Sequence, residues 1–251
     1  MLRLEGIRLR RGDFRLEADL SIATGARVAV IGPSASGKST LLLGIGGFVE
    51  PEAGRILWQG EEITRLAPGK RPLTTLFQDV NLYPHLTLFQ NVALGLSPRL
   101  RPTAAERRRI EEALDQVGLG GLGARRPGQL SGGQQSRAAL ARALLRARPL
   151  LMLDEPFAAL GPALKDEMLD LVASVLTRTG ATLLMVTHDP GDALRLTPET
   201  IVVMEGGAAP PVPTAPLLAD PPPALAAYLG GGGPQPSGVR ADRGPARSSP
   251  S

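Results

Sequence analysis

The chain has 251 residues, a formal net charge of +4 at pH 7 and no cysteine, which excludes disulfides, thiol catalysis and cysteine-bound metals. Its apolar content is that of an ordinary globular protein, and no run of about 18 apolar residues occurs that could cross a membrane. Only three lysines are present, so arginine carries most of the positive charge, and aromatic residues make up 3% of the chain. We interpret the basic balance as a solvated surface and expect no nucleic-acid partner.

The start of the chain predicts two antiparallel strands. Apolar and polar side chains alternate over residues 2–9 and 15–22, as they do in strands with one buried face. The same alternation leaves no apolar core for a signal peptide, so we expect none.

A phosphate site is predicted directly after the next strand, RVAVIG at 27–32. GPSASGKST matches the pattern G-x-x-x-x-G-K-[ST], and residues 40–48 continue as a helix. The glycines let successive N–H groups face phosphate oxygens, Lys38 adds a positive charge, and the Ser39 hydroxyl can ligate Mg²⁺. The predicted nucleotide-binding residues are Gly32, Pro33, Ser34, Ala35, Ser36, Gly37, Lys38, Ser39 and Thr40.

A helical insertion is predicted at about residues 97–127. Thr103 and Glu106 have the spacing of a capping box, and Ile110 and Leu114 recur on one helix face. The insertion lies between two segments that are predicted to handle nucleotide.

The stretch LSGGQQSRAALARALL at 130–145 predicts a second phosphate site. Ser131 is placed as an N-cap, two glycines follow it, and alanines and leucines continue the helix. The first N–H groups of a helix have no internal partner, and the helix dipole favours negative charge there. Such a helix end binds phosphate, so one chain carries two predicted glycine-rich phosphate sites.

A second α/β segment follows. LLMLDEP predicts a buried strand that ends in Asp154, where α/β sheets place their ligands, and residues 181–189 and 200–204 are further strands. Strands alternate with helices, so we expect an α/β fold with a mostly parallel sheet. Asp154 can hold Mg²⁺ through water, and Glu155 can accept a proton from an attacking water. His188, one strand end over, can reach a γ-phosphate.

The last segment, residues 231–251, is rich in Gly, Pro, Arg and Ser. Its apolar residues are one valine and two alanines, too few to offset the entropy of ordering the segment. We therefore expect a disordered tail after an ordered domain at residues 1–230.

The order of GPSASGKST, LFQD, LSGGQ, LLMLDEP and THD resembles that of the ATP-binding subunits of ABC transporters. The resemblance covers residues 1 to about 230. It implies a P-loop NTPase with the ABC ATPase fold, an N-terminal antiparallel β region and a helical subdomain that leads into LSGGQ. It also implies that two subunits, here two identical copies, pair head to tail. Each ATP then lies between the P-loop of one subunit and the LSGGQ of the other, so the two phosphate sites serve two different nucleotides.

The resemblance implies ATP and Mg²⁺ as ligands and assigns roles residue by residue. Gln78 in LFQD would contact Mg²⁺ or the lytic water, beside the contact with the membrane subunits. Ser39 and Asp154 would hold the same metal, Glu155 would be the general base, and His188 would hold the γ-phosphate. The residues that meet the γ-phosphate of the partner's ATP would be Ser131, Gly132, Gly133 and Gln134.

Two positions depart from the family pattern. Gly161 in AALG stands where the family usually has an aspartate that crosses the dimer, which leaves the coupling of the two sites open. Arg10 and Arg11 stand in the region where an aromatic residue commonly stacks on adenine. Either an arginine plane or Phe14 is expected to take that role.

Three stretches, at 77–98, 155–172 and 183–207, resemble the ATPases of bacterial thiamine importers. They imply uptake of thiamine or its pyrophosphate, with two integral-membrane permease subunits and a periplasmic solute-binding protein as partners. The subunit would lie peripherally on the cytoplasmic face of the bacterial inner membrane. Importers of polyamines, iron or molybdate, and a non-transport machine such as the cell-division complex, are the alternatives.

Overall fold

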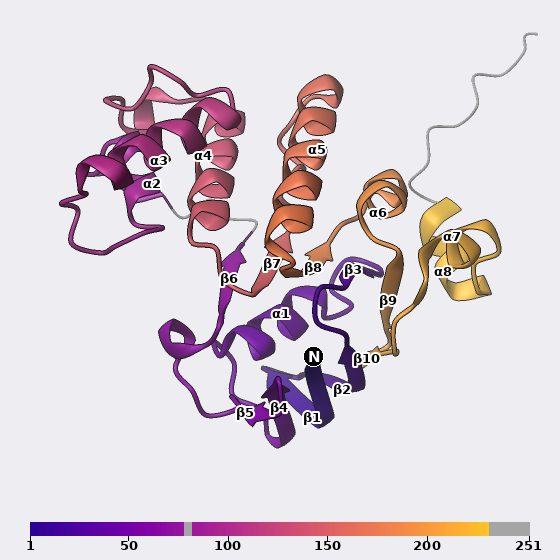
Figure 1. Ribbon diagram of the computed structural model, residues 1–251. Helices are drawn as coiled ribbons and strands as arrows, with labels where there is room; N and C mark the ends of the chain where they lie inside the picture. Colours follow the sequence, from indigo (N-terminus) through magenta and orange to yellow (C-terminus); the bar gives the residue numbers. More distant parts are fainter. Residues whose placement is uncertain (78–81, 231–251) are drawn as a thin grey trace, which may run out of the picture.

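The computed structural model describes residues 1–77 and 82–230, which form one mixed sheet flanked by helices (Figure 1). The parallel part of the sheet has the order β9-β3-β8-β7-β6, and every neighbouring pair in it runs parallel. In that order its strands are Glu199–Met204, Arg27–Ile31, Thr182–Val186, Leu150–Asp154 and Leu73–Leu76. The predicted α/β fold with a mostly parallel sheet core is therefore confirmed.

The N-terminal strands extend the sheet beyond β9 in the order β10-β2-β1-β4-β5. In that order they are Gly207–Ala208, Phe14–Ile22, Leu2–Arg11, Ala53–Trp58 and Glu61–Glu62, and the short strand β11, Val212–Pro213, pairs with β9. The long strands β1 and β2 pair antiparallel and alternate buried and exposed side chains, as the sequence pattern predicts. The register of β1 shifts around Gly6, whose φ is +53°.

The helices are α1 Lys38–Gly46, α2 Leu88–Ala93, α3 Ala104–Gln116, α4 Gly132–Leu145, α5 Pro162–Thr179, α6 Pro190–Leu196, α7 Thr214–Ala219 and α8 Pro223–Gly230, with 3₁₀ turns at Pro68–Lys70 and Pro127–Gln129. Four of the helices, α2, α3, α4 and α6, begin after a residue whose side chain accepts a backbone N–H of the first turn. Within the described ranges, none of the helices is long and apolar enough to cross a membrane.

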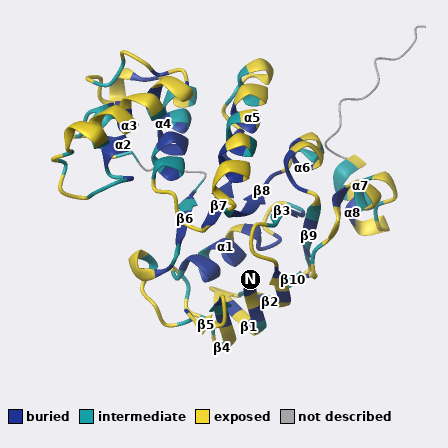
Figure 2. Ribbon diagram, viewed as in Figure 1, coloured by how far each residue is buried: buried dark blue, intermediate teal, exposed yellow. Residues whose placement is uncertain are grey.

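The parallel strands are buried on both faces (Figure 2). In β7, Leu150 and Met152 pack with α1 and the antiparallel strands, whereas Leu151 and Leu153 pack with helices α2 to α5. This is why the sequence of β7 is a continuous apolar run rather than an alternating one. The carboxyl ends of these strands are thereby held in fixed positions between two cores.

Helix α3 lies inside the predicted insertion. Its N-cap Thr103 accepts the N–H of Glu106 at 3.3 Å, and the Glu106 carboxylate accepts the N–H of Thr103 at 2.7 Å, which completes the expected capping box. Ile110 and Leu114 are buried, and α3 packs with α2 and α4 beside the sheet (Figure 1). The division into a domain and a tail stays a prediction, because the tail lies outside the described residues.

One charged side chain, Arg71, is almost completely buried at the end of α1. It is 2% exposed, and its guanidinium donates to the carbonyls of Gly44 (3.0 Å), Ile45 (2.7 Å), Thr64 (2.6 Å) and Leu66 (2.9 Å). Two of these carbonyls, those of Gly44 and Ile45, are in the last turn of α1, where a helix leaves carbonyls without an internal partner. Burial lowers the pKa of Arg71, and the side chain ties α1 to the segment that enters β6.

Candidate functional site

The first phosphate site is the loop that joins β3 to α1. A Cβ atom on Gly32 would lie 2.0 Å from the Val203 carbonyl oxygen, and one on Gly37 would lie 2.8 Å from the Phe14 ring. Gly37 also has a φ of +108°, which L side chains rarely adopt. The loop therefore needs glycine at both positions.

Lys38 brings positive charge into this loop. Its ammonium donates to the carbonyls of Gly32 (2.8 Å) and Pro33 (2.7 Å) and is largely buried. Burial lowers the pKa of Lys38, while the nearby charges of Glu155 and Asp154 raise it. The ammonium thus lies between the loop and the carboxylates that end β7.

The loop also holds a polar atom that lacks a protein partner. The Ser36 hydroxyl is buried and makes no hydrogen bond to the described residues. A buried donor of this kind is costly unless a ligand accepts from it. With the close-packed backbone and the Lys38 ammonium, it makes the loop chemically fit for phosphate oxygens.

Asp154 and Ser39 form the part of the site that suits a metal ion. Asp154 ends β7 and is 4% exposed. Burial raises the pKa of Asp154, and a hydrogen bond from the Ser39 hydroxyl opposes that rise. Among residues 1–77 and 82–230, no three His, Asp or Glu side chains gather into a metal site of their own. A Mg²⁺ ion here would therefore need hydroxyl, water and phosphate oxygens in addition to one carboxylate, which is the donor set it prefers.

Glu155 and His188 meet at the ends of the neighbouring strands β7 and β8. The His188 Nδ1 atom lies 3.4 Å from the Glu155 Oε2 atom. Glu155 has a φ of +48°, an uncommon backbone state for a residue other than glycine, and its N–H donates to the Val186 carbonyl at 3.0 Å. Strained backbone of this kind is often found at functional sites, where surrounding contacts maintain it.

The second phosphate site, at the start of α4, has simpler chemistry. Ser131 accepts the N–H of Gln134 at 3.2 Å, and the Gln134 amide oxygen accepts the N–H of Ser131 at 2.9 Å. Ser131 and Gly132 are exposed. In the described part of the chain, no hydrogen bond links these residues to the loop at Gly32.

Comparison with known protein families decides what this combination represents. A family model described as ABC transporter matches residues 16–158, more than half of the chain. The chain belongs to the ABC transporter family. The resemblance inferred from the motif order is thereby confirmed.

Two relatives of this ABC protein carry the same name. A protein of Cereibacter sphaeroides called thiamine import ATP-binding protein ThiQ is 63% identical over 230 residues, which are 92% of this chain and 100% of the relative. A protein of Ruegeria sp. with that name is 56% identical over 230 residues, with the same coverage of both chains.

Solved structures of ABC cassettes superpose on this ABC protein. A dimeric ATP-binding cassette in a post-hydrolysis state, bound to ADP and Pi, gives a TM-score of 0.76 at 30% identity, over 85% of this chain and 99% of the other. A nucleotide-free ATP-binding cassette from an ABC transporter gives a TM-score of 0.76 at 25% identity, over 88% and 96%. The predicted ABC ATPase fold is confirmed, and the protein is an ATP-binding ATPase.

Three sequence-based expectations concern residues at the edges of this site. Gln78 lies outside the described residues, so its role stays a prediction. Arg10 donates to the Gly12 carbonyl (3.0 Å) and approaches Glu52 (3.7 Å), whereas the Phe14 ring packs on Gly37 of the P-loop. Of the two groups considered for adenine, Phe14 is therefore the one beside the nucleotide loop.

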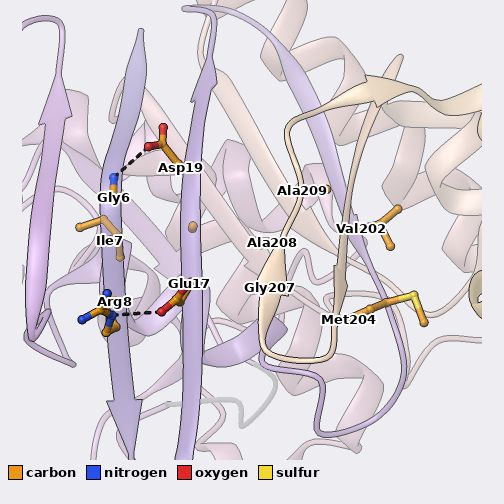
Figure 3. Close-up of a pocket in the computed structure, with 11 residues that line it drawn as sticks. Gly6, Ile7, Arg8, Glu17, Asp19, Val202, Met204, Gly207, Ala208 and Ala209 are labelled. Atoms are coloured by element: carbon orange, nitrogen blue, oxygen red, sulfur yellow. Dashed lines mark hydrogen bonds and ion pairs between the residues drawn. The ribbon is translucent and has the colours of Figure 1, made fainter.

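A hollow of about 580 Å³ lies elsewhere, on the exposed side of β1, β2 and β10 (Figure 3). Its charged side chains are already paired: Arg8 with Glu17 at 3.0 Å, and Asp19 with the N–H of Gly6 at 3.3 Å. We assign it no role, because it has neither the charge nor the position of the P-loop site.

The sequence patterns did not reveal the residues that support the site from behind. Lys165, Asp189 and Asp192 form a partly buried charge cluster next to His188, and Arg71 holds the end of α1. The one available signal was the Asp-Pro pair after His188, since aspartate followed by proline is typical of a helix start.

Proposed function

We propose that this protein is the ATP-hydrolysing subunit of a bacterial ABC importer that takes up thiamine or thiamine pyrophosphate. The observation that supports the cargo is the 63% identity to a relative named as a thiamine import ATP-binding protein, over the full length of that relative. The same match, which spans 230 residues, supports an ATPase domain at residues 1–230.

Nucleotide binding is assigned to the P-loop. Backbone N–H groups within residues 34–40 and the Ser36 hydroxyl would face phosphate oxygens. Lys38 would exchange its present carbonyl partners for the β- and γ-phosphates. Phe14 would pack against the base, since its ring already lies on the P-loop backbone. The Ser39 hydroxyl and Asp154 would hold Mg²⁺, which when bound neutralises phosphate charge.

Hydrolysis is assigned to the pair at the ends of β7 and β8. Glu155 would accept a proton from the attacking water, because its carboxylate lies next to the phosphate loop and is only partly exposed. His188, 3.4 Å from Glu155, would hold the γ-phosphate and orient the carboxylate. Gln78 would contact the metal or the same water.

A head-to-tail homodimer is the assembly that uses both phosphate sites. A solved relative with 30% identity is a dimer bound to ADP and Pi. At the start of α4, Ser131 and Gly132 are exposed, so a partner molecule would have access to this helix end. The residues that would meet the partner's γ-phosphate are Ser131, Gly132, Gly133 and Gln134.

The permease is expected to contact a groove of about 720 Å³ between α4 and strand β6. Leu76 and Tyr83, which flank the predicted Gln78 segment, both line it. So do three arginines, Arg142, Arg146 and Arg148, and two threonines whose hydroxyls have no partner among the described residues, Thr74 and Thr75. The three arginines therefore suit the groove to a polar segment of a permease subunit. Two such subunits would lie between the ATPase, on the cytoplasmic face of the inner membrane, and a periplasmic solute-binding protein.

Uptake of labelled thiamine by cells that lack this protein tests the proposal. We expect uptake to fall and to return with the wild-type gene but not with Glu155→Gln. If uptake is unchanged in the deletion strain, the thiamine assignment is wrong. Co-purification of the permease would then identify whether polyamine, iron or molybdate is the cargo, or whether a non-transport machine such as the cell-division complex is the partner.

A further inference from the structure

A charged cluster outside the phosphate site joins the start of α5 to the loop that carries His188. Lys165 lies in the first turn of α5, where its N–H donates to the Gly161 carbonyl at 2.9 Å. Its ammonium pairs with Asp189 and with Asp192, the latter at 2.7 Å. The cluster therefore connects the segment at Gly161 to the end of β8.

Both chain neighbours of His188 are held by this cluster. The N–H of Asp189 donates to the Thr187 hydroxyl at 3.1 Å, and the Asp189 side chain caps α6. The Thr187 hydroxyl in turn donates to Asp192 at 3.3 Å. A continuous set of bonds thus runs from Lys165 to the residues before and after His188.

The His188 ring has little packing of its own. Its side chain is 59% exposed, and its one ion-pair partner among the described residues is Glu155. The ring position therefore depends mainly on the backbone that carries it. The groups concerned border one small cavity of about 90 Å³, lined by Glu155, Phe157, Leu160, Lys165, His188 and Asp189 among others.

Lys165 is protonated in this arrangement. Burial disfavours the ammonium, but its hydrogen bonds to Asp189 and Asp192 raise the pKa of Lys165 overall. The Asp192 side chain is only 7% exposed, so burial raises its pKa while the bond from Lys165 opposes that rise. Without the ammonium, the carboxylates of Asp189 and Asp192 would have no counter-charge and would repel each other. The loop that carries His188 would then favour a different position.

We propose that Lys165 is a positioning residue for ATP hydrolysis, which sets the His188 loop against Glu155 by binding Asp189 and Asp192. The inference rests on the proposed ATPase function. Lys165 makes no bond to the P-loop within the described ranges, and the groups assigned to most of the nucleotide's phosphate oxygens belong to that loop at the end of β3, with His188 assigned to the γ-phosphate alone. Its loss therefore changes turnover and leaves ATP affinity in place.

The test is steady-state ATP hydrolysis by the full chain, with Lys165→Met compared with the wild type. We expect kcat to fall about 10- to 100-fold, because a small displacement of a reacting group has effects of that size. The KM for ATP should stay within about twofold. Lys165→Arg keeps the charge and should recover most of the lost kcat. Asp189→Asn, at a more exposed position, is a milder variant that should lower kcat in the same direction.

The chain offers a matched control in Arg195. This α6 residue pairs with Asp166 and with Asp170 (2.8 Å), both on α5, so it links the same two helices as the cluster does. Its ion pairs are exposed and contribute little stability. Arg195→Met is expected to leave kcat within about twofold. An equal fall of kcat in Arg195→Met and Lys165→Met would mean that any ion pair between α5 and α6 supports turnover. That result would overturn the proposal.

A second measurement asks whether Lys165 acts through His188. In a His188→Ala background, Lys165→Met should lower kcat little further, because residues that act as a unit are not additive. The same loss in both backgrounds, or an unchanged kcat in Lys165→Met alone, overturns the proposal. A wild-type chain that binds ATP but hydrolyses none would overturn the proposed function itself, which is a distinguishable result.

Discussion

The two glycine-rich helix starts of this chain, at α1 and at α4, are built differently. At α1 the loop is partly buried, the Lys38 ammonium bonds to its carbonyls, and Asp154 and Glu155 approach from β7. At α4 the start is exposed, and Ser131 and Gln134 bond to each other's backbone. The first site has charges that can bind phosphate and metal and can accept a proton. The second has helix N–H groups, a hydroxyl and an amide.

This difference predicts which of the two sites binds ATP first. A loop with a buried ammonium and an unpaired hydroxyl can hold a nucleotide by itself, because it neutralises phosphate charge. A bare helix start gains less from an anion, typically about 0.3–1 kcal/mol at an exposed position. We therefore expect ATP to bind the P-loop of one copy before the α4 start of a second copy closes on it.

The largest expected effect on turnover comes from a substitution that removes the proton acceptor and leaves both phosphate sites unchanged. Glu155→Gln retains the shape of the side chain but cannot accept a proton, so turnover should fall about 10²- to 10⁴-fold. ATP binding and dimer formation should persist. Rates of phosphate release and nucleotide binding to the purified chain check this, and near-normal hydrolysis would remove Glu155 from the role of base.

The next largest effect should separate the two helix starts. Lys38→Met removes the ammonium from the P-loop, and each lost charge-assisted bond to phosphate is worth about 1.5–3 kcal/mol. ATP affinity should therefore fall at least about tenfold. Titration with a fluorescent ATP analogue measures this. The start of α4 is unchanged in this variant, so retained affinity would contradict the P-loop as the primary site.

A smaller effect is expected from Ser131→Ala at the start of α4. Loss of the N-cap should cost about 1 kcal/mol of stability, and turnover should fall about tenfold because one donor to the partner's phosphate is lost. ATP affinity of the single chain should not change. Thr103→Ala is the matched control, since it removes the same kind of capping box from α3. If both variants lose turnover equally, the contribution of Ser131 is structural.

The sequence predicts those parts of the fold and of the site whose residues are close together along the chain. The P-loop, the β7 strand that ends in Asp154, and the capping boxes at Thr103 and Ser131 depend on neighbouring residues, so the sequence predicts them. The Lys165 cluster forms only when α5 and β8 are packed, across 24 residues of chain. No periodic pattern or motif marks such a contact before the fold is known.

Arg71 illustrates the second kind of limit. As one of many arginines it has no distinguishing pattern, yet it is almost completely buried and donates to four carbonyls. Its burial follows from the way α1 ends against the segment before β6, a tertiary arrangement. The predicted residues of the phosphate loop follow from short motifs, whereas the residues that hold its elements in place depend on the whole fold.

The smallest expected effect concerns Gly161, which departs from the family pattern at the N-cap of α5. Gly161 has a φ of −70° and a ψ of 160°, makes no side-chain cap, and has open space where a Cβ would point. An aspartate fits there and would cap the helix, so Gly161→Asp should stabilise the chain by a few tenths of a kcal/mol, about 1 °C in Tm.

Gly161→Ala is the control for this last change, because alanine adds a Cβ without a capping oxygen and is a poorer N-cap than glycine. The pair should move Tm in opposite directions. If aspartate also crosses to a partner molecule, only Gly161→Asp should raise the Hill coefficient for ATP hydrolysis. A raised Tm with an unchanged Hill coefficient would mean that the position acts within one chain. The contact between the two helix starts would then depend on Ser131 to Gln134, without help from the start of α5.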